Sequence, residues 1–423
     1  MGRNVLITTH VRALSLRPAI CYDSGMITVQ PISLDWLIVG GGIHGTAVSL
    51  YLSRLKHIDR ERLRVLDPHA RPLAQWDANT ANVGMSHLRS PHVQSLDSDP
   101  WSISTFAQTR RGAPIAEFIP THNRPSLSLF RAHADWIRER HNLDALRLQG
   151  RATGLTRTSD GWRVDTNIGP VTTRNVVLAI GAGEQPRWQD WATALRDQGA
   201  PVAHVFDAGF DRETLPDWSH AVVIGGGISA VQLALALSLR QPGAVTLLMR
   251  RPLRIAPFDS DLGWVAGSDL QRFRNVSDYT KRREIIRAAR HTGTVPPDVA
   301  ALLKQAEAAG ALRVQIGEVA TVRRTDDSIS LSLADGGALT TDRLLLATGF
   351  YSRRPGGAWL DDAIAAYDLP VSTCGYPIVG ADLAWAGGLF VTGPLAELYI
   401  GPVSRNIIGA RLAAEAIARA IQP

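Results

Sequence analysis

The chain has 423 residues, which is long enough for two or three domains with well-developed cores. Hydrophobic residues make up 45% and charged residues 20% of it, an ordinary globular composition. No apolar run reaches the roughly 18 residues of a membrane-spanning helix, so we expect no membrane partner. The formal net charge of +6 comes from scattered arginines. Nucleic-acid binders carry basic clusters with interleaved aromatic residues, so we expect no nucleic-acid partner either.

The only two cysteines, Cys21 and Cys374, are far apart and form no C-x-x-C pair. This excludes a disulfide scaffold and a dithiol redox centre. It also argues against a zinc site, and we expect no metal.

Residues 1–32 are treated as an N-terminal extension outside the fold. They contain Arg3, Arg12 and Arg17 and no acidic residue before Asp23, as a transit peptide would. Met26 lies just ahead of the first convincing strand, however, and an over-extended start or a frayed tail is the favoured interpretation. On that interpretation the protein is cytoplasmic.

The chain contains a rough internal repeat. In the first copy, an apolar strand at residues 35–39 leads into GGGIHG, a helix at 46–55 and a strand at 63–66 that ends at Asp67. In the second copy, a strand at 221–224 leads into GGGISA, a helix at 231–239 and a strand at 245–249 that ends at Arg250-Arg251. Each copy has the strand–loop–helix–strand order of a βαβ unit.

The similarity continues downstream, where residues 152–183 and 319–350 both show short alternating strands followed by a buried strand that ends at glycine. The sequence therefore predicts an α/β fold with two Rossmann-like dinucleotide-binding domains, each with a β-meander. We expect a first domain at 33–200 and 341–423. A second domain at 201–340, with an insertion at 256–295, would be inserted in it.

The two glycine loops fit the G-x-G-x-x-G/A fingerprint. The first glycine makes a tight turn, the second leaves room for a pyrophosphate, and the third position lets helix and strand pack closely. The pyrophosphate then lies at the helix N-terminus, on free N–H groups. The residues expected to contact cofactor in these loops are Gly40, Gly41, Gly42, Gly45, Gly225, Gly227, Ser229 and Ala230.

The ends of the second strands assign the ligands. Asp67 can accept a hydrogen bond from a ribose hydroxyl, as FAD requires, and the alternative is a turn aspartate before Pro68. Arg250 and Arg251 can bind the 2′-phosphate of NADPH, and they therefore favour NADPH over NADH as the second cofactor. The alternative is that the two arginines form a solvated basic turn. The predicted cofactors are FAD and NADPH.

With these residues in place, the chain resembles the class B flavin monooxygenases, most closely the N-hydroxylating branch typified by ornithine and lysine N-monooxygenases. One matching segment is DRLLLATGF at 342–350, which includes Thr348 and Gly349. Another is Trp76 followed by GMSHLR at 84–89, with Pro125-Ser126 and Phe130 beyond.

The resemblance implies hydride transfer from NADPH to FAD, oxygen addition to give a C4a-hydroperoxyflavin, and hydroxylation of a small molecule at an amine nitrogen. Small-molecule substrate and molecular oxygen would be the partners, and relatives are often oligomeric. The glutamine and lysine that follow the methionine in the family are absent from residues 86–92. Ornithine or lysine as the substrate is therefore in doubt.

The resemblance also places residues around the flavin. Met85, His87 and Arg89 are candidate catalytic residues, although the histidine and arginine could instead contact FAD phosphates or the surface. Ser86, Asp259, Ser260 and Asp261 are candidates for substrate binding, and the last three would serve equally well as a helix N-cap cluster. Further cofactor contacts are expected from Trp76, Thr348, Gly349, Gly393 and Ser404.

Two other functions stay open at this point. One is a two-domain flavin reductase or dehydrogenase that passes electrons to a partner. The other is a non-catalytic flavin-binding redox sensor.

Overall fold

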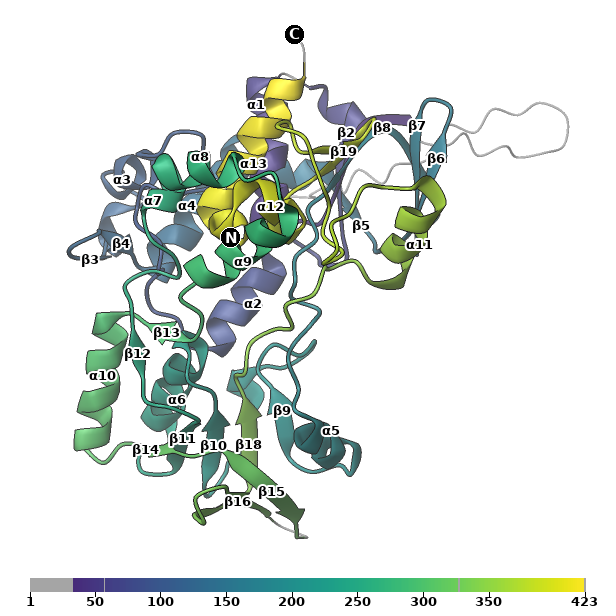
Figure 1. The fold of residues 1–423 in the computed structure, drawn as a ribbon. Helices are drawn as coiled ribbons and strands as arrows, with labels where there is room; N and C mark the ends of the chain where they lie inside the picture. The colour runs from purple at the N-terminus through teal and green to yellow at the C-terminus, as the bar shows by residue number, and fades with distance from the viewer. Residues whose placement is uncertain (1–32, 57, 326–327, 422–423) are drawn as a thin grey trace, which may run out of the picture.

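The computed structural model describes residues 33–56, 58–325 and 328–421. The predicted N-terminal extension, residues 1–32, lies outside these ranges. The described chain forms an upper and a lower lobe, which extended segments join (Figure 1). No helix within the described ranges is both long enough and apolar enough to cross a membrane.

The upper lobe is built around a mostly parallel sheet with the strand order β19-β20-β8-β1-β2-β5. Its central strand β1 (Ser33–Val39) pairs in parallel with β2 (Leu63–Asp67) and with β8 (Val171–Leu178). Leu37 and Ile38 of β1 are fully buried, because both faces of the sheet are covered. The remaining strands of this order are β5 (Arg147–Gln149), β19 (Ala384–Ala386) and β20 (Leu389–Val391).

The predicted meander of the first domain is present. Strand β6 (Ala152–Thr158) pairs with β7 (Gly161–Thr166), and β7 pairs with β8, all antiparallel. Strand β8 therefore belongs to both the meander and the parallel sheet.

Helices from the two ends of the described chain complete the upper lobe. Helix α1 (Ile43–Leu55) packs against α13 (Ile407–Ala420), and both contribute to one hydrophobic core with β1. The C-terminal segment therefore returns to the first domain, as predicted. The other helices and the hairpin of this lobe are α2 (Ala74–Asn82), α3 (Ser102–Ala107), α4 (Leu127–Arg140), α11 (Gly357–Tyr367), α12 (Glu397–Ile400), β3 (Phe118–Ile119) and β4 (Arg124–Pro125).

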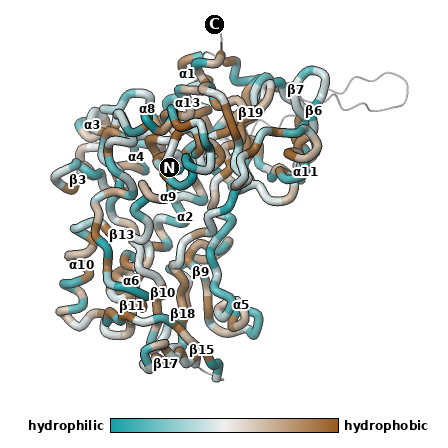
Figure 2. Tube along the Cα trace, in the orientation of Figure 1, coloured by the Kyte–Doolittle hydropathy of each residue, from teal (hydrophilic) through white to brown (hydrophobic). Residues whose placement is uncertain are grey.

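The lower lobe contains a second, fully parallel sheet with the order β14-β11-β10-β18-β9. The three central strands, β10, β11 and β18, are hydrophobic and mostly buried (Figure 2). The bounds of the strands in this sheet are β9 (Val202–His204), β10 (Ala221–Ile224), β11 (Val245–Met249), β14 (Arg313–Ile316) and β18 (Arg343–Leu346).

Different elements cover the two faces of this sheet. Helices α6 (Ile228–Arg240) and α10 (Pro297–Ala308) pack together with one face. A separate antiparallel sheet and α5 (Asp190–Asp197) share a core with the other face. That sheet consists of β15 (Val319–Arg324), β16 (Ile329–Leu333) and β17 (Ala338–Thr341). The second copy thus has its meander. In the first copy one strand, β8, belongs to both the meander and the parallel sheet, whereas in the second copy β17 belongs to the meander and β18 to the parallel sheet.

Strand pairing moves two of the predicted domain boundaries. Strand β18 lies between β10 and β9, so residues 343–346 belong to the second sheet and not to the first domain. Helix α5 packs in the second lobe, so that lobe begins before residue 201. The chain crosses between lobes within 179–189 and 347–356, where Arg187 N–H donates to Gly349 O at 2.8 Å.

The predicted insertion packs mostly on the upper lobe. Trp264, Phe273 and Ile286 are buried in the core that contains β1. The insertion contains α7 (Gly263–Ala266), α8 (Ser268–Arg274), α9 (Tyr279–Ala289) and β13 (Thr294–Val295), and β13 pairs with β12 (Arg254–Ile255) just before it. It follows the second βαβ unit in sequence but closes over the first domain in space. Short 3₁₀ helices lie at η1 (Arg60–Arg62), η2 (Ala113–Ile115), η3 (Leu143–Leu146), η4 (Arg212–Thr214), η5 (Gly393–Ala396) and η6 (Pro402–Arg405).

Candidate functional site

The first glycine loop has the steric pattern that its fingerprint predicts. Gly40 has φ +110, and a Cβ there would lie 2.5 Å from Ala179 O. A Cβ on Gly45 would lie 1.8 Å from Gly40 O, so loop and helix approach as closely as glycine allows. A Cβ on Gly42 would meet nothing within 4 Å. The loop therefore leaves space at the one glycine that must face a ligand.

Helix α1 opens directly on this space. Its N-cap, Gly42, provides no side-chain cap, and the N–H groups of residues 42–45 donate to no described group. Asp67 at the end of β2 accepts the N–H of Gly41 at 2.6 Å and the N–H of His69 at 2.9 Å. It therefore braces the loop as a turn residue, and its oxygens retain lone pairs for a ribose hydroxyl. The site fits a pyrophosphate followed by a ribose.

The second glycine loop repeats the pattern. Gly225 has φ +150, and a Cβ there would lie 2.5 Å from Ala347 O and 2.9 Å from the Cβ of the buried Ala230. The nearest atom to a Cβ on Gly227 would be the Gly293 Cα at 3.5 Å. Ser229 lies in the first turn of α6. A side-chain carbon at the second glycine of this loop would therefore fit, but in contact with the backbone of Gly293.

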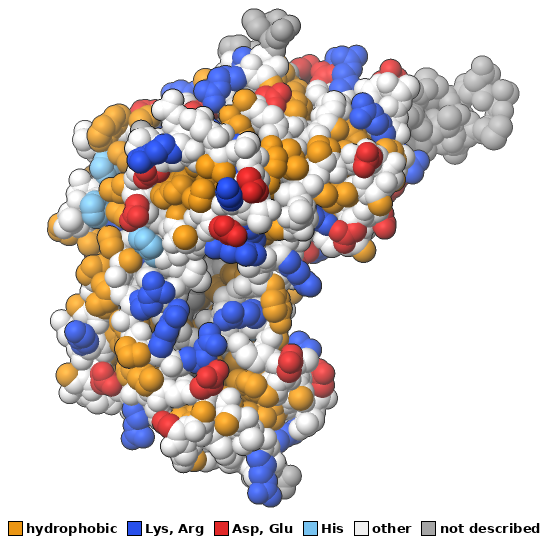
Figure 3. Space-filling view, viewed as in Figure 1, with side chains coloured by type: hydrophobic (Ala, Val, Ile, Leu, Met, Phe, Trp, Pro, Cys, Tyr) orange, Lys and Arg blue, Asp and Glu red, His pale blue; other side chains and the backbone are white. Residues whose placement is uncertain are grey.

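Basic side chains lie beside the second loop. Arg250 is exposed and reaches Glu318 only at 4.0 Å. Arg251 extends toward Gly293, where a Cβ would lie 3.7 Å from its Nη2. Lysine and arginine side chains also gather around the hollow between the lobes (Figure 3). These charges favour an anionic ligand in this region.

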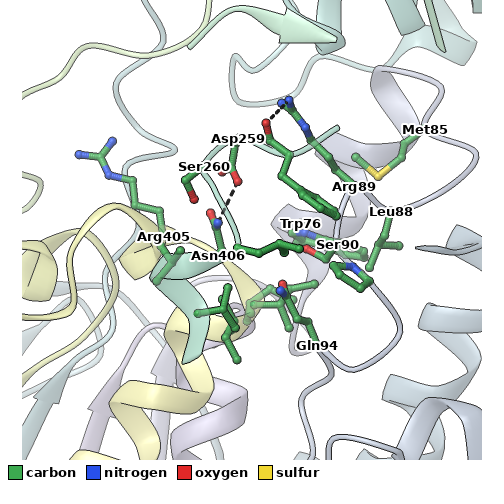
Figure 4. A pocket seen from close by; sticks show the side chains of 18 residues that line it. Trp76, Met85, Leu88, Arg89, Ser90, Gln94, Asp259, Ser260, Arg405 and Asn406 are labelled. Atoms are coloured by element: carbon green, nitrogen blue, oxygen red, sulfur yellow. Dashed lines mark hydrogen bonds between the residues drawn. The ribbon is translucent and has the colours of Figure 1, made fainter. Parts of the chain in front are cut away.

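A cavity of about 240 Å³ lies between the first glycine loop, the insertion and the start of α13. Its wall is mostly apolar, with a few polar groups at one side (Figure 4). It is lined by Ile43, Trp76, Met85, Leu88, Arg89, Ser90, Pro91, Gln94, Phe258, Asp259, Ser260, Leu262, Val265, Val403, Arg405, Asn406, Ile407 and Ile408.

The cavity divides the predicted catalytic and substrate residues into two groups. Four of them line it, Met85, Arg89, Asp259 and Ser260, together with the predicted cofactor contact Trp76. The others, Ser86, His87 and Asp261, are not part of its wall. Residues from two segments far apart in sequence, 76–94 and 258–265, therefore line one cavity.

Arg89 is occupied by the insertion. Its Nη2 donates to Ala256 O at 2.9 Å, to Phe258 O at 2.6 Å and to Thr294 Oγ1 at 2.7 Å, and its Nε donates to Pro257 O at 3.2 Å. These bonds fix the loop that carries Asp259 and Ser260. The geometry therefore favours a positioning role for Arg89 over the predicted catalytic one.

His87 and Asp261 lie away from the cavity. The His87 ring contacts Ser86 Oγ at 3.2 Å and Glu117 Oε1 at 3.5 Å, and partial burial lowers the pKa of its imidazole. Asp261 is 73% exposed and lies 3.6 Å from His291. The structure does not bring either residue to the predicted reaction site.

Asp259 is joined to the C-terminal helix. Asn406 Nδ2 donates to Asp259 Oδ1 at 3.1 Å (Figure 4). Asn406 is the N-cap of α13, but its side-chain oxygen accepts no N–H from the first turn of the helix. The N–H groups of residues 407–409 consequently donate to no described group. The N-terminus of a 14-residue helix therefore borders the cavity with its positive dipole end free.

The remaining predicted cofactor residues lie in two places. Thr348 and Gly349 occupy the crossing between the lobes, where the Thr348 hydroxyl bonds to Arg187 O and to the buried His204. Gly393 and Ser404 lie near the first glycine loop. Ser404 is fully buried, and its Oγ has no partner among the described residues.

Sequence reasoning missed His44 and Gln94. His44 is the polar residue inside GGGIHG, and its Nδ1 lies 2.8 Å from Thr392 Oγ1. A Cβ on Gly393 would lie 3.6 Å from its ring, and burial lowers its imidazole pKa to about 4. His44 thus ties the first loop to the end of β20. Gln94 is buried in the cavity wall. The signal for His44 was a polar residue within a glycine loop, whereas nothing in the sequence marked Gln94.

Within the described ranges, no group of three or more histidine, cysteine or acidic residues is arranged to hold a metal ion.

Comparison with known proteins agrees with this geometry. The FAD-NAD(P)-binding family profile matches residues 37–183. The fold matches an ornithine hydroxylase from Pseudomonas aeruginosa (TM-score 0.71, 17% identity, covering 92% of this chain and 98% of that chain). It also matches the desferrioxamine-pathway cadaverine monooxygenase from Erwinia amylovora (0.70, 17%, 91% and 94%). No curated protein sequence matches the chain.

The chain has the fold of the N-hydroxylating flavin monooxygenases. Its first domain is an FAD-NAD(P)-binding domain, and both predicted Rossmann-like units are present. A more distant match is a bacillithiol disulfide reductase from Bacillus cereus (0.56, 18%, 92% and 98%).

Proposed function

We propose that this protein is an NADPH-dependent flavin monooxygenase that hydroxylates a small molecule at an amine nitrogen. The observation that supports this best is the cavity itself. It adjoins the first glycine loop through Ile43, it is mostly apolar, and its polar side presents Asp259 and Asn406. Such a site suits an amine that must be held close to a flavin and away from water.

FAD would be held by the first loop. The open side of Gly42, the free N–H groups at the start of α1 and Asp67 suit its diphosphate and ribose. The uncapped N-terminus of α13 suits the negative charge of a reduced flavin ring. NADPH would be held by the second loop, with Arg250 and Arg251 at its 2′-phosphate. Bound together, the two cofactors would supply the hydride and the oxygen activation.

The chain's own residues orient the substrate. Asp259 Oδ1 accepts from Asn406, which leaves Oδ2 to accept an N–H from the amine. The same oxygen can take the proton that an ammonium group must lose before its nitrogen becomes a nucleophile. Trp76, Met85 and Leu88 form the apolar part of the wall and exclude water.

The structural match to a disulfide reductase supports a second candidate function, that of a flavin reductase. Cys374 is the one cysteine among the described residues, and its Sγ contacts Ser372 Oγ at 2.9 Å. A single thiol cannot cycle between dithiol and disulfide within one described chain. This argues against a dithiol-based disulfide reductase, whereas a flavin reductase that passes electrons to a partner is distinguished from the monooxygenase by the assay below.

NADPH consumption by the purified flavoprotein tests the proposal. With a panel of primary amines, we expect one amine to stimulate NADPH oxidation, oxygen uptake and hydroxylamine formation together. Asp259→Asn removes the charge at the cavity and should raise the KM for that amine about tenfold or more. Asp261→Asn is the matched control, because this exposed carboxylate lies outside the cavity wall.

Two results would contradict the proposal. One is NADPH oxidation that reduces an added disulfide or electron carrier with no product oxygenation, which would indicate a reductase. The other is a protein that neither retains nor regains FAD.

A further inference from the structure

Beside the cavity lies a group of three arginines around one buried carboxylate. Glu397, the first residue of α12, is fully buried. Arg283 contacts its Oε1, while Arg290 Nη2 and Arg405 Nη2 contact its Oε2 at 3.1 Å and 3.0 Å. We refer to these four residues as the Glu397 cluster. Figure 4 shows the Arg405 guanidinium on the far side of the view from Met85, beyond Asp259 and Asn406.

The cluster carries an excess of positive charge. Three guanidinium groups share one carboxylate, and one further acid, Asp259, acts on Arg290 electrostatically. The other groups that the arginines contact are neutral: Tyr376 Oη accepts from Arg405, and Pro402 O accepts from Arg290. Burial and the charge of Arg405 lower the pKa of Arg290 to about 9. The three positive charges therefore repel one another, and the single carboxylate of Glu397 compensates this repulsion only in part.

Each arginine also has a nitrogen that no described group uses. Arg283 is only 4% exposed at its side chain, and its Nε has no partner. Arg290 and Arg405 bond through Nε and Nη2 and leave Nη1 free of described partners. Their side chains are 19% and 24% exposed, so they can be reached by a small ligand.

We infer that Arg290 and Arg405 form a binding site for an oxyanion, a carboxylate or a phosphate group, beside the cavity. Guanidinium N–H groups donate charge-assisted hydrogen bonds to such groups, here through the two unused Nη1 groups, and an added negative charge would reduce the positive excess around Glu397. Glu397 holds both forks by the same oxygen and so fixes their spacing. The identity of the ligand rests on the proposed function, because the anion belongs either to the substrate or to the dinucleotide. The anion site itself is argued from the arginines alone and does not rest on that function.

Sulfate binding to the flavin-loaded protein tests the site without turnover. Sodium sulfate is titrated against sodium chloride at equal ionic strength, and binding is followed by calorimetry and by the rise in melting temperature. We expect saturable binding whose Kd rises at least tenfold in Arg290→Gln and in Arg405→Gln. Arg287→Gln is the matched control, because Arg287 is exposed on α9 and contacts no described partner, and its Kd should not change.

Competition identifies the source of the anion. If 5-aminopentanoate displaces sulfate and pentylamine does not, the site takes an acid group of the substrate. If NADP⁺ displaces it, the site takes a nucleotide phosphate. Should a glutamine variant fail to fold, the lysine variant at the same position keeps the charge and is expected to bind sulfate more weakly than the native fork. Non-saturable sulfate binding, or equal affinity in native protein and both arginine variants, would overturn the inference.

Discussion

At the residue scale, equivalent-looking glycines differ in what surrounds them. Gly45 touches the backbone of Gly40, whereas Gly42 faces open space with an ordinary extended conformation (φ −74). In the second loop, Gly227 has φ −102, and a Cβ there would make only an ordinary contact with the Gly293 Cα at 3.5 Å. A methyl group at Gly42 or Gly227 would therefore occupy ligand volume without disturbing the protein.

Gly42→Ala and Gly227→Ala should separate the two cofactor sites. Both variants should fold with a change in unfolding free energy within about 1 kcal/mol. Gly42→Ala should lose FAD affinity by roughly tenfold to a hundredfold, about 1.4–2.8 kcal/mol, while Gly227→Ala keeps its flavin and loses NADPH affinity to a similar extent. Flavin content after dialysis and NADP⁺ titration measure the two effects, and each variant controls for the other. Equal FAD retention in both would show that the first loop does not hold the flavin.

At the element scale, the insertion depends on one side chain from the first domain. Arg89 bonds to three consecutive carbonyls at 256–258 and to Thr294, so it joins the two ends of the insertion to the segment that follows α2. Hydrogen bonds from a charged donor stabilise a fold more than neutral ones. The position of the loop that carries Asp259 therefore depends on the hydrogen bonds of Arg89.

Arg89→Ala should loosen that loop. Amide exchange of residues 256–264 should accelerate by roughly thirtyfold, which corresponds to about 2 kcal/mol of lost local stability. Arg89→Lys should restore little, because an ammonium cannot reach four acceptors. Arg272→Ala removes a mostly exposed arginine within the same insertion and serves as the control. Unchanged exchange in Arg89→Ala would assign the loop's order to other contacts.

At the scale of the whole molecule, three histidines from different parts of the fold are buried or half-buried and are neutral at pH 7. Burial lowers the pKa of His44, His133 and His204 to about 4 from an ordinary 6.5. They lie in the first glycine loop, in α4 beside Ser102, and in β9 beside Thr348. The unfolded chain binds protons at these residues below pH 6.5, whereas the folded chain does so only near pH 4.

Stability should accordingly fall as the pH drops from 6.5 toward 4. Each of the three histidines should contribute a loss of roughly 2 kcal/mol between pH 7 and pH 5. Urea unfolding at a series of pH values measures the slope. His133→Gln should reduce that slope by about a third, since this side chain keeps a polar group near Ser102 but cannot titrate. A slope that is identical in native protein and His133→Gln would mean that other groups titrate in this range.

The sequence by itself determined the two dinucleotide-binding units, because local signals suffice for them: an apolar strand, three glycine positions and a helix follow one another within about 20 residues. The residues at the strand ends, Asp67 in the first copy and Arg250-Arg251 in the second, also predicted different cofactors for the two loops. The family resemblance predicted that Trp76, Met85 and Asp259 lie near one site. Each of these inferences rests on residues that are close in sequence or share a motif.

Only the tertiary structure decided which side chains meet. It assigned β18 to the second sheet, directed Arg89 to the insertion, and moved His87 and Asp261 away from the cavity. It also gathered Glu397 with Arg283, Arg290 and Arg405, which no spacing in the sequence connects. The physical reason is that packing between segments more than a hundred residues apart fixes the direction of each side chain. That direction determines whether a charge is paired, buried or free to bind a ligand.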